Sequence, residues 1–265
     1  MNTRLALLFF LILLFVAPIR AGAQFVTPGA PLIKLEALRS YPHNPEHFTQ
    51  GLFFYGDDLY ESTGLYGKSL LTRKDPQSGE TLAQTSLDAG YFGEGATLAE
   101  GRIYLLTWRE HIALIFNPDS LQLEGWFTYG GEGWGLTYDG ERLIRSDGTK
   151  TLYFHGLDGT PQGTLDVYDA GVPVANLNEL EWLPEQRLIL ANVWHVNRIA
   201  AIDPVSGRVV FWLDISGLVP QDLRGSAEHV PNGIALTPDG KTLWLTGKLW
   251  PAIYVVAWPP GLLKQ

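Results

Sequence analysis

The chain repeats one two-strand unit five times, and this repetition constrains the fold more than any other feature. In each copy a small or polar residue leads into an alternating apolar strand, then a turn, then a second strand that ends in a polar or aromatic cluster. The copies begin at Gln50, Glu94, Trp134, Asn178 and Asn232, so their starts are spaced by 44, 40, 44 and 54 residues. Periods of this length are typical of repeat architectures in which each repeat is one small structural unit.

Four of the units are followed by another strand and a hairpin turn rich in Pro, Gly, Asp or Asn. These turns lie at residues 75–79, 117–120, 157–159 and 203–207. Because such turns join antiparallel strands, each period holds four strands, which is typical of a propeller blade. We therefore predict an all-β fold, a five-bladed β-propeller, with a β-sandwich as the alternative.

The two ends of the repeat region indicate how the ring closes. The fifth unit ends soon after residues 254–258 and lacks its outermost strand, whereas residues 32–38 form a strand that belongs to no unit. We expect this N-terminal strand to pair in the last blade, because the pairing would remove two exposed strand edges.

The N-terminus has the pattern of a secretory signal peptide. Arg4 precedes an apolar run over residues 5–16, and residues 21–23 form a small-residue cleavage site. We expect residues 1–23 to be removed and residues 24–265 to form a single five-bladed β-propeller catalytic domain, exported to the periplasm or secreted and free of the membrane. An uncleaved membrane anchor is the alternative, which the short and interrupted apolar run disfavours.

Charge and cysteine content exclude several classes of partner and chemistry. Residues 1–23 carry two positive charges and no negative ones, so their removal changes the formal net charge from −9 to −11. Such a balance argues against nucleic acid or an anionic membrane as partner. The absence of cysteine excludes disulfides, thiolate metal sites and a cysteine nucleophile.

The propeller geometry brings two sets of residues to one mouth of the central channel. The first strand of a blade lines the channel, and the second returns to the same mouth, so the strand starts meet the strand ends. These ends are the clusters around Ser62, Trp108, Asp147, Trp194 and Lys248. Apolar walls with a few polar groups are typical of a ligand pocket. Glu94, between two glycines, is the candidate for acid/base chemistry, because burial would raise its pKa.

Several motifs in register resemble the glutamine cyclotransferase family, the plant and bacterial type of glutaminyl-peptide cyclotransferase. In chain order they are Phe48–Leu52, Glu61–Gly67, Phe92–Gly95, Trp134–Thr137, Leu177–Glu181, Ala191–Trp194 and Thr246–Trp250. The resemblance implies a five-bladed propeller that converts an N-terminal glutamine of a peptide or protein to pyroglutamate and releases ammonia. Residues 217–229 match no motif, so substrate preference stays open if this loop overhangs the mouth.

The residues matching the family's functional positions have side chains suited to this reaction. By this resemblance the catalytic residues are Glu94, Lys248 and Asn178, and the substrate-binding residues are Phe48, Gln50, Phe92, Trp108, Trp134 and Trp194. Glu94 would act as general acid/base. Lys248 and the Asn178 amide would donate to the oxyanion. The aromatic side chains would wall the pocket and keep the substrate amine neutral, and Gln50 would hold the peptide backbone.

Two other classes remain open at this point. A calcium-dependent lactonase or phosphoesterase of the six-bladed propeller type could use oxygen ligands from Glu94, Asp147, Asn178 and Asn232. A non-catalytic propeller that binds a partner protein is the second alternative.

Metals and oligomeric state complete the expectations. Zinc is disfavoured, since Pro42 and Pro45 prevent the helix that would place His43 and His47 on one face. We expect a monomer that requires no metal or cofactor, although inward carbonyls would allow a structural calcium in the central channel.

Overall fold

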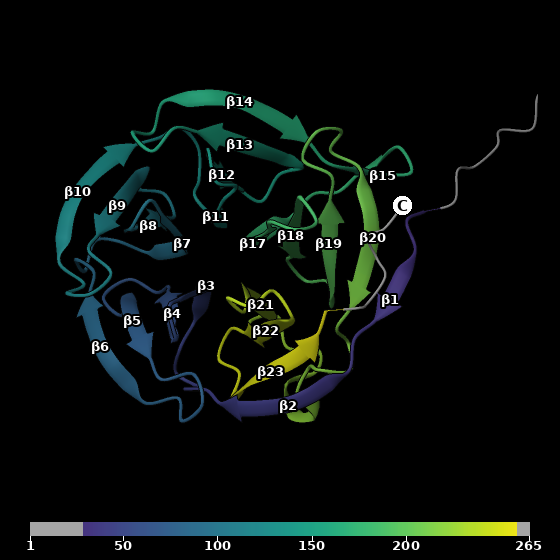
Figure 1. Ribbon diagram of the computed structural model, residues 1–265, viewed down its shortest axis with the longest axis horizontal. Helices are drawn as coiled ribbons and strands as arrows, with labels where there is room; N and C mark the ends of the chain where they lie inside the picture. Colours follow the sequence, from purple (N-terminus) through teal and green to yellow (C-terminus); the bar gives the residue numbers. More distant parts are fainter. Residues whose placement is uncertain (1–28, 259–265) are drawn as a thin grey trace, which may run out of the picture.

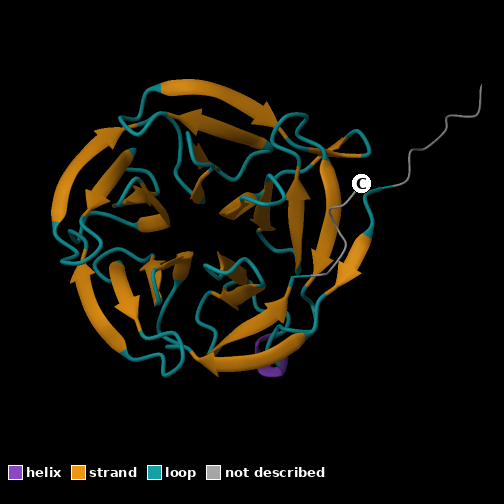
Figure 2. Cartoon of the chain, viewed as in Figure 1, coloured by secondary structure: helices purple, strands orange, loops and turns teal. Residues whose placement is uncertain are grey.

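The computed structural model describes residues 29–258, which form five small, mostly antiparallel sheets arranged in a ring (Figure 1). The five-bladed propeller is confirmed. Among the described residues, the one helical element is the 3-10 turn η1 (Gln221–Leu223), and all other regular elements are strands (Figure 2). No helix in residues 29–258 is long and apolar enough to span a bilayer. The predicted signal peptide and its cleavage site lie outside the described residues.

The first three blades are each built from four strands in chain order, from the channel outward. The first blade is β3 (Thr49–Tyr55), β4 (Asp58–Thr63), β5 (Leu70–Lys74) and β6 (Thr81–Ser86); the second is β7 (Gly93–Ala99), β8 (Arg102–Thr107), β9 (Ile112–Phe116) and β10 (Leu123–Thr128). The third is β11 (Leu136–Tyr138), β12 (Leu143–Arg145), β13 (Thr151–His155) and β14 (Pro161–Asp166). A small hairpin of β15 (Tyr168–Asp169) and β16 (Val172–Pro173) follows.

The last two blades also take in the N-terminal part of the described chain. The fourth blade is β17 (Leu177–Leu183), β18 (Leu188–Val193), β19 (Arg198–Ile202), β20 (Val209–Asp214) and β1 (Leu32–Lys34). The fifth blade is β21 (Pro231–Leu236), β22 (Thr242–Gly247), β23 (Ala252–Ala257) and β2 (Ala37–Pro42).

Ring closure differs in one respect from the sequence expectation. The N-terminal segment does pair in the last blade, where β2 lies antiparallel to β23. The single strand expected over residues 32–38 is wrong, because the segment is two strands. β1 pairs in parallel with β20 of the fourth blade, and the chain then crosses to the fifth blade at Leu35, which is buried between them. Since the two sheets are separate, one straight strand cannot pair with both.

The core is divided among the blade interfaces. Five apolar clusters each combine residues of two neighbouring blades, such as Phe53 of β3 with Ile103 of β8, or Leu52 of β3 with Trp244 of β22. Successive side chains of the inner strands are buried and point to opposite faces, so one strand supplies residues to the interfaces on both sides of its blade. Consequently the ring is held closed by the same kind of contact all the way round.

Candidate active site

Irregular pairing at the start of the inner strands sets the direction of the site residues. The register between the first and second strands shifts between Thr49 and Gly51, between Gly93 and Ala96, between Leu177 and Leu180, and between Pro231 and Ile234. These shifts enclose the repeat starts Gln50, Glu94, Asn178 and Asn232. Because a bulge re-aims the side chains of the residues within it, these positions can depart from the regular alternation of the strand.

The glycines beside these residues allow neighbouring blades to come close. A Cβ atom on Gly95 would lie 2.6 Å from the Trp134 carbonyl oxygen, and one on Gly135 would lie 1.9 Å from the Asn178 carbonyl oxygen. The Gly95 N–H donates to the Trp134 carbonyl at 2.7 Å. Thus the glycine after Glu94 is required mainly by the close approach of the next blade.

Side chains at the ends of the second strands fix the bulges of the next blade. The Ser62 hydroxyl donates to the Glu94 carbonyl, and the Ser146 hydroxyl donates to the Asn178 carbonyl, both at 2.7 Å. The Asn192 side-chain oxygen accepts from the Gly233 N–H at 3.0 Å. The strand ends predicted at the mouth therefore include residues that position the backbone of the site.

All nine predicted site residues line one cavity of about 270 Å³ at the channel mouth. The lining residues are Phe48, Gln50, Leu65, Phe92, Glu94, Trp108, Trp134, Asn178, Trp194, Ala227, Glu228 and Lys248. Asp147 and Asn232 do not line it. The structure thus brings the predicted residues together, while their individual roles stay predictions.

The charged groups of the cavity are a buried acid and a buried base. Glu94 is 5% exposed, and burial raises the pKa of its carboxyl well above the usual value; the Lys248 charge opposes this, and Glu132 and Glu110 reinforce it. Burial lowers the pKa of Lys248 to about 8, against the opposing effect of Glu94. Within residues 29–258 the Glu94 carboxylate has no hydrogen-bond donor. It is therefore buried but free to contact a ligand.

Aromatic rings form the walls around these two groups. Trp134 and Trp194 meet edge to face at 5.7 Å between ring centroids, and Phe92 lies 5.4 Å from Trp108. The Lys248 Nζ atom lies 4.6 Å from the centre of the Phe48 ring, a cation–π geometry.

Glu132 fixes two of these walls and was missed by the sequence analysis. Its Oε2 atom accepts from the indole N–H groups of Trp108 at 2.8 Å and Trp134 at 3.0 Å. Burial alone would raise the pKa of Glu132, but the hydrogen bonds from both indoles and from Arg109 hold it below the usual value. The sequence does carry a signal, because Glu132 lies between two glycines as Glu94 does.

Two amides of the site differ in how their polar atoms are satisfied. The Gln50 Oε1 atom accepts from Asn232 at 3.0 Å, which leaves the Gln50 NH₂ group as the donor available to a ligand. The Asn178 Oδ1 atom is buried without a partner among the described residues. Because an unpaired buried acceptor costs about 1–3 kcal/mol, this atom favours a ligand that donates a hydrogen.

The unmatched loop of residues 217–229 does reach the mouth. Ala227 and Glu228 line the cavity, as does Leu65, whose φ of 82° is in the left-handed region. None of the three was predicted, since loop placement depends on contacts that the repeat pattern does not encode.

His43 and His47 come together by a route that the sequence analysis did not foresee. No helix joins them, as expected, yet both rings contact the buried carboxylate of Glu61 on β4. Lys74 Nζ contacts the same carboxylate. The lack of a helix is therefore not a valid reason to disfavour zinc, since the two histidines meet at Glu61 without one. The Lys74 ammonium group beside the same carboxylate is the feature that bears on whether a metal ion fits.

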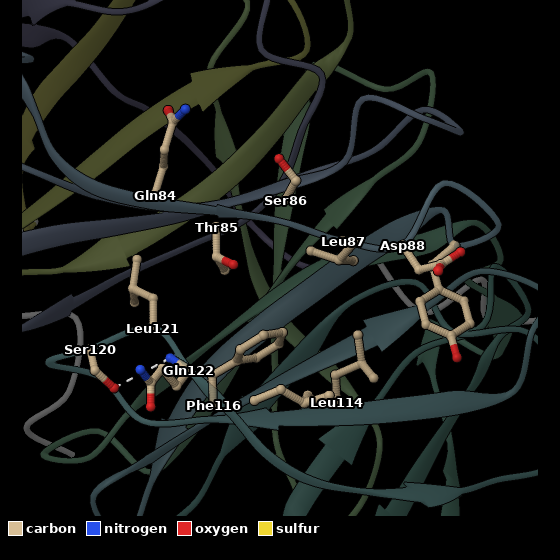
Figure 3. A pocket seen from close by; sticks show the side chains of 12 residues that line it. Gln84, Thr85, Ser86, Leu87, Asp88, Leu114, Phe116, Ser120, Leu121 and Gln122 are labelled. Atoms are coloured by element: carbon tan, nitrogen blue, oxygen red, sulfur yellow. Dashed lines mark hydrogen bonds between the residues drawn. The ribbon is translucent and has the colours of Figure 1, made fainter.

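A wider groove of about 530 Å³ lies on the outer rim between the first two blades (Figure 3). Its walls include Leu87, Leu114 and Phe116, with hydroxyl and amide groups from Thr85 and Gln122. Asp88 is its one acid, and it lacks the paired acid and base of the channel mouth. We therefore place the candidate active site in the smaller cavity.

The fold and the cavity define a class: a five-bladed propeller enzyme whose pocket, at one channel mouth, holds a buried acid and a buried lysine between aromatic walls. The model of the glutamine cyclotransferase family matches residues 10–258, and the chain belongs to this family. This assignment removes the six-bladed hydrolase alternative, whose proposed ligands Asp147 and Asn232 also lie outside the cavity.

Two relatives agree with the family assignment. The chain is 37% identical over 268 residues to a glutaminyl-peptide cyclotransferase of Arabidopsis thaliana, covering 95% of this chain and 81% of that protein. The crystal structure of Myxococcus xanthus glutaminyl cyclase superposes with a TM-score of 0.79 at 36% identity, covering 86% of this chain and 97% of the other.

Proposed function

We propose that this cavity cyclises the N-terminal glutamine of peptides or proteins to pyroglutamate, with Glu94 moving the proton. The cyclotransferase activity itself follows from family membership and from the two relatives. The proton role rests on one observation: Glu94 is buried, has a raised pKa and has no hydrogen-bond donor in the described part of the chain.

The size of the cavity suits one residue. A volume of about 270 Å³ lies below the roughly 300–1,000 Å³ typical of sites for drug-sized ligands. The apolar walls favour a neutral amine over an ammonium ion, because burial penalises charge. They also favour a folded glutamine side chain, in which the α-amine lies close to its own carboxamide carbon.

The reaction balances with Glu94 as the only proton carrier. The α-nitrogen attacks the side-chain carbonyl carbon, a carbon–nitrogen bond forms, and the carbonyl electrons move to oxygen. The Glu94 carboxylate takes a proton from the attacking nitrogen and delivers it to the departing nitrogen. The carbonyl then re-forms, the old carbon–nitrogen bond breaks and ammonia leaves. General acid/base catalysis of this kind is worth about 10²- to 10⁴-fold.

Lys248 and Asn178 would make different kinds of contact with the substrate. With a pKa of about 8, Lys248 is mostly cationic at neutral pH and can stabilise the oxyanion. The unpaired Asn178 Oδ1 atom favours accepting a hydrogen from the substrate amine or carboxamide, rather than the donor role expected from the sequence. The free NH₂ group of Gln50 can donate to the first peptide carbonyl.

The cellular location, the partner class and the oligomeric state are also proposals. The pattern of residues 1–23 supports export to the periplasm or secretion, and the net negative charge supports a peptide partner rather than nucleic acid. We propose a monomer. The intact mass of the exported protein would check the removal of residues 1–23, and size-exclusion chromatography would check the monomeric state. A structural calcium in the channel stays a prediction.

The test is ammonia release from a dipeptide with N-terminal glutamine, compared between the native protein and Glu94→Gln. We expect native turnover and a loss of at least about 10²-fold in kcat for the variant, with unchanged circular dichroism. Glu181→Gln is the matched control, because Glu181 also has a pKa raised by burial, to about 8, yet does not line the cavity. Full activity of Glu94→Gln would refute the proton role.

A further inference from the structure

A second buried glutamate, Glu61, collects polar contacts behind the pocket wall. Its side chain is fully buried. The Oε1 atom lies 2.9 Å from His43 Nε2 and 2.7 Å from Thr49 Oγ1, and the Oε2 atom lies 2.8 Å from His47 Nδ1 and contacts Lys74 Nζ. These five residues, here called the Glu61 cluster, satisfy both carboxylate oxygens with two partners each.

The Glu61 cluster resembles a metal site in its ligands but holds its own cation. One ligand atom each from His43, His47 and Glu61 lies within 4.8 Å of the others. Lys74 Nζ lies within hydrogen-bond distance of both Glu61 Oε2 and His47 Nδ1 at 3.1 Å, so an ammonium group already neutralises the carboxylate. A divalent ion in the same place would be repelled by this charge.

Two members of the Glu61 cluster, Thr49 and His47, lie next to residues of the pocket lining. Thr49 lies between Phe48 and Gln50, which both line the cavity. The His47 carbonyl accepts from the N–H of Leu249, which follows Lys248, at 2.8 Å. These bonds join the first and last blades beside three lining residues.

The segment that carries Lys248 needs this support. The Trp250 carbonyl accepts from His43 Nδ1 at 2.6 Å, and Leu249 has a φ of 60°, which is unfavourable for a residue with a side chain. Such a conformation persists only where its surroundings hold it. The contact of Lys248 Nζ with the Phe48 ring at 4.6 Å therefore depends on two segments that the Glu61 cluster ties together.

We propose that Glu61 is a positioning residue for the cyclisation site, which through Thr49, His47 and His43 holds the Phe48–Gln50 segment against the segment carrying Lys248. This inference rests on the proposed function. A displacement of about 1 Å in a reacting group can cost about 10²-fold in rate, so the cluster sets kcat although none of its members lines the cavity.

Two threonines that bond Glu61 give a matched test. Thr49 Oγ1 donates to the carboxylate at 2.7 Å, whereas Thr72 Oγ1 donates to the Glu61 backbone carbonyl at 3.3 Å, and both residues are fully buried. In Thr49→Val we expect kcat for a Gln dipeptide to fall about tenfold, because a loosened Phe48–Gln50 segment misplaces the reacting groups by a fraction of 1 Å. In Thr72→Val we expect kcat unchanged, with both variants assayed well below their unfolding temperatures. Equal loss in the two variants would overturn the proposal.

The titration of Lys248, followed by ¹³C NMR of its Cε atom and assigned with Lys248→Met, tests positioning without any turnover. We expect Thr49→Val to move the pKa from about 8 toward the ordinary lysine value, because a loosened wall admits water, and Thr72→Val to leave it unchanged. If the native protein releases no ammonia, the proposed function fails while this titration still decides the inference; an unmoved titration in Thr49→Val would overturn it.

Dialysis against a chelator tests whether Lys74, and not a metal ion, neutralises Glu61. We expect the native rate of ammonia release, or in its absence the Lys248 titration, to be unchanged. A loss that zinc restores would overturn the assignment of the cluster as lysine-neutralised.

Discussion

Two glutamates of neighbouring blades are both buried but have opposite electrostatic environments. Glu61 is surrounded by His43, His47, Lys74 and Thr49. Burial alone would raise its pKa, but the charges of His43 and Lys74 and the hydrogen bonds from both histidines hold the pKa well below the usual value. Glu94 makes no ion pair among the described residues, and burial raises its pKa against the partial opposition of the Lys248 charge. Burial alone therefore does not leave a carboxylate free to contact a substrate. We propose that the absence of partners does this for Glu94, because both carboxylate oxygens of Glu61 are already bonded.

The largest expected difference between the two glutamates is in the free energy of unfolding when each is replaced by glutamine. Glu61→Gln should destabilise the protein by about 3–5 kcal/mol, because it leaves buried positive charge uncompensated. Glu94→Gln should cost little at neutral pH, because it replaces an unpaired buried acid with a neutral group of the same shape. Urea unfolding of both variants measures the difference, and similar losses would contradict the contrast.

The pH dependence of the same two variants sharpens the contrast. The folded pKa of Glu94 is raised, so its contribution to stability is present below the unfolded pKa of about 4.3 and is lost as pH rises through the folded value. The folded pKa of Glu61 is lowered, so its contribution is present above about 4.3 and is lost as pH falls. Relative to the native protein, Glu94→Gln should gain stability as pH rises above about 4.3. Glu61→Gln should show a nearly constant deficit from about pH 5 to 8, and this deficit should shrink as pH falls below about 4.3.

An intermediate effect is expected at Glu132, which orients two pocket walls. Glu132→Gln should raise KM by about two- to tenfold, the equivalent of one hydrogen bond of roughly 0.5–1.5 kcal/mol, since the amide oxygen cannot serve both indoles as well as a carboxylate. Glu110→Gln is the control, because Glu110 also raises the Glu94 pKa but bonds neither indole. Steady-state kinetics with one Gln dipeptide would measure KM for both variants. An equal KM in the two would show that negative charge near Glu94, and not the bonds to the indoles, determines the effect.

The smallest effect is expected at Glu228, an exposed acid of the unmatched loop that lines the cavity. Glu228→Lys should shift the kcat/KM ratio between Gln-Lys and Gln-Glu dipeptides a few-fold toward Gln-Glu, and the shift should shrink with added salt. Glu185→Lys, on the exposed turn between β17 and β18, makes the same charge change away from the cavity. A salt-independent shift, or the same shift in Glu185→Lys, would show that the charge of this loop does not determine substrate preference.

The two regions also differ in how far the sequence predicts them. The Glu94 pocket follows from the repeat, because equivalent starts of inner strands must meet at one mouth, and the bulges at Gln50, Glu94, Asn178 and Asn232 follow the same period. The Glu61 cluster joins a loop to the first, second and third strands of the first blade, and no other blade repeats this combination in the described residues. His43 and His47 could therefore not be paired by spacing, and the same holds for Glu228. The split of β1 from β2 likewise depends on tertiary pairing with β20.

The titration of Glu94 itself tests the central claim most directly. We expect the carboxyl ¹³C resonance of Glu94, assigned with Glu94→Gln, to titrate well above the ordinary value of about 4.3 for a glutamate. The substrate α-amine, with an ordinary pKa of about 7.7–8.0, gives kcat/KM an acid limb in every variant, and the native enzyme should show a second proton dependence at the Glu94 pKa, because kcat/KM also reports the essential base of the free enzyme. A Glu94 that titrates at the ordinary value, or the same second proton dependence in the residual activity of Glu94→Gln, would contradict the account.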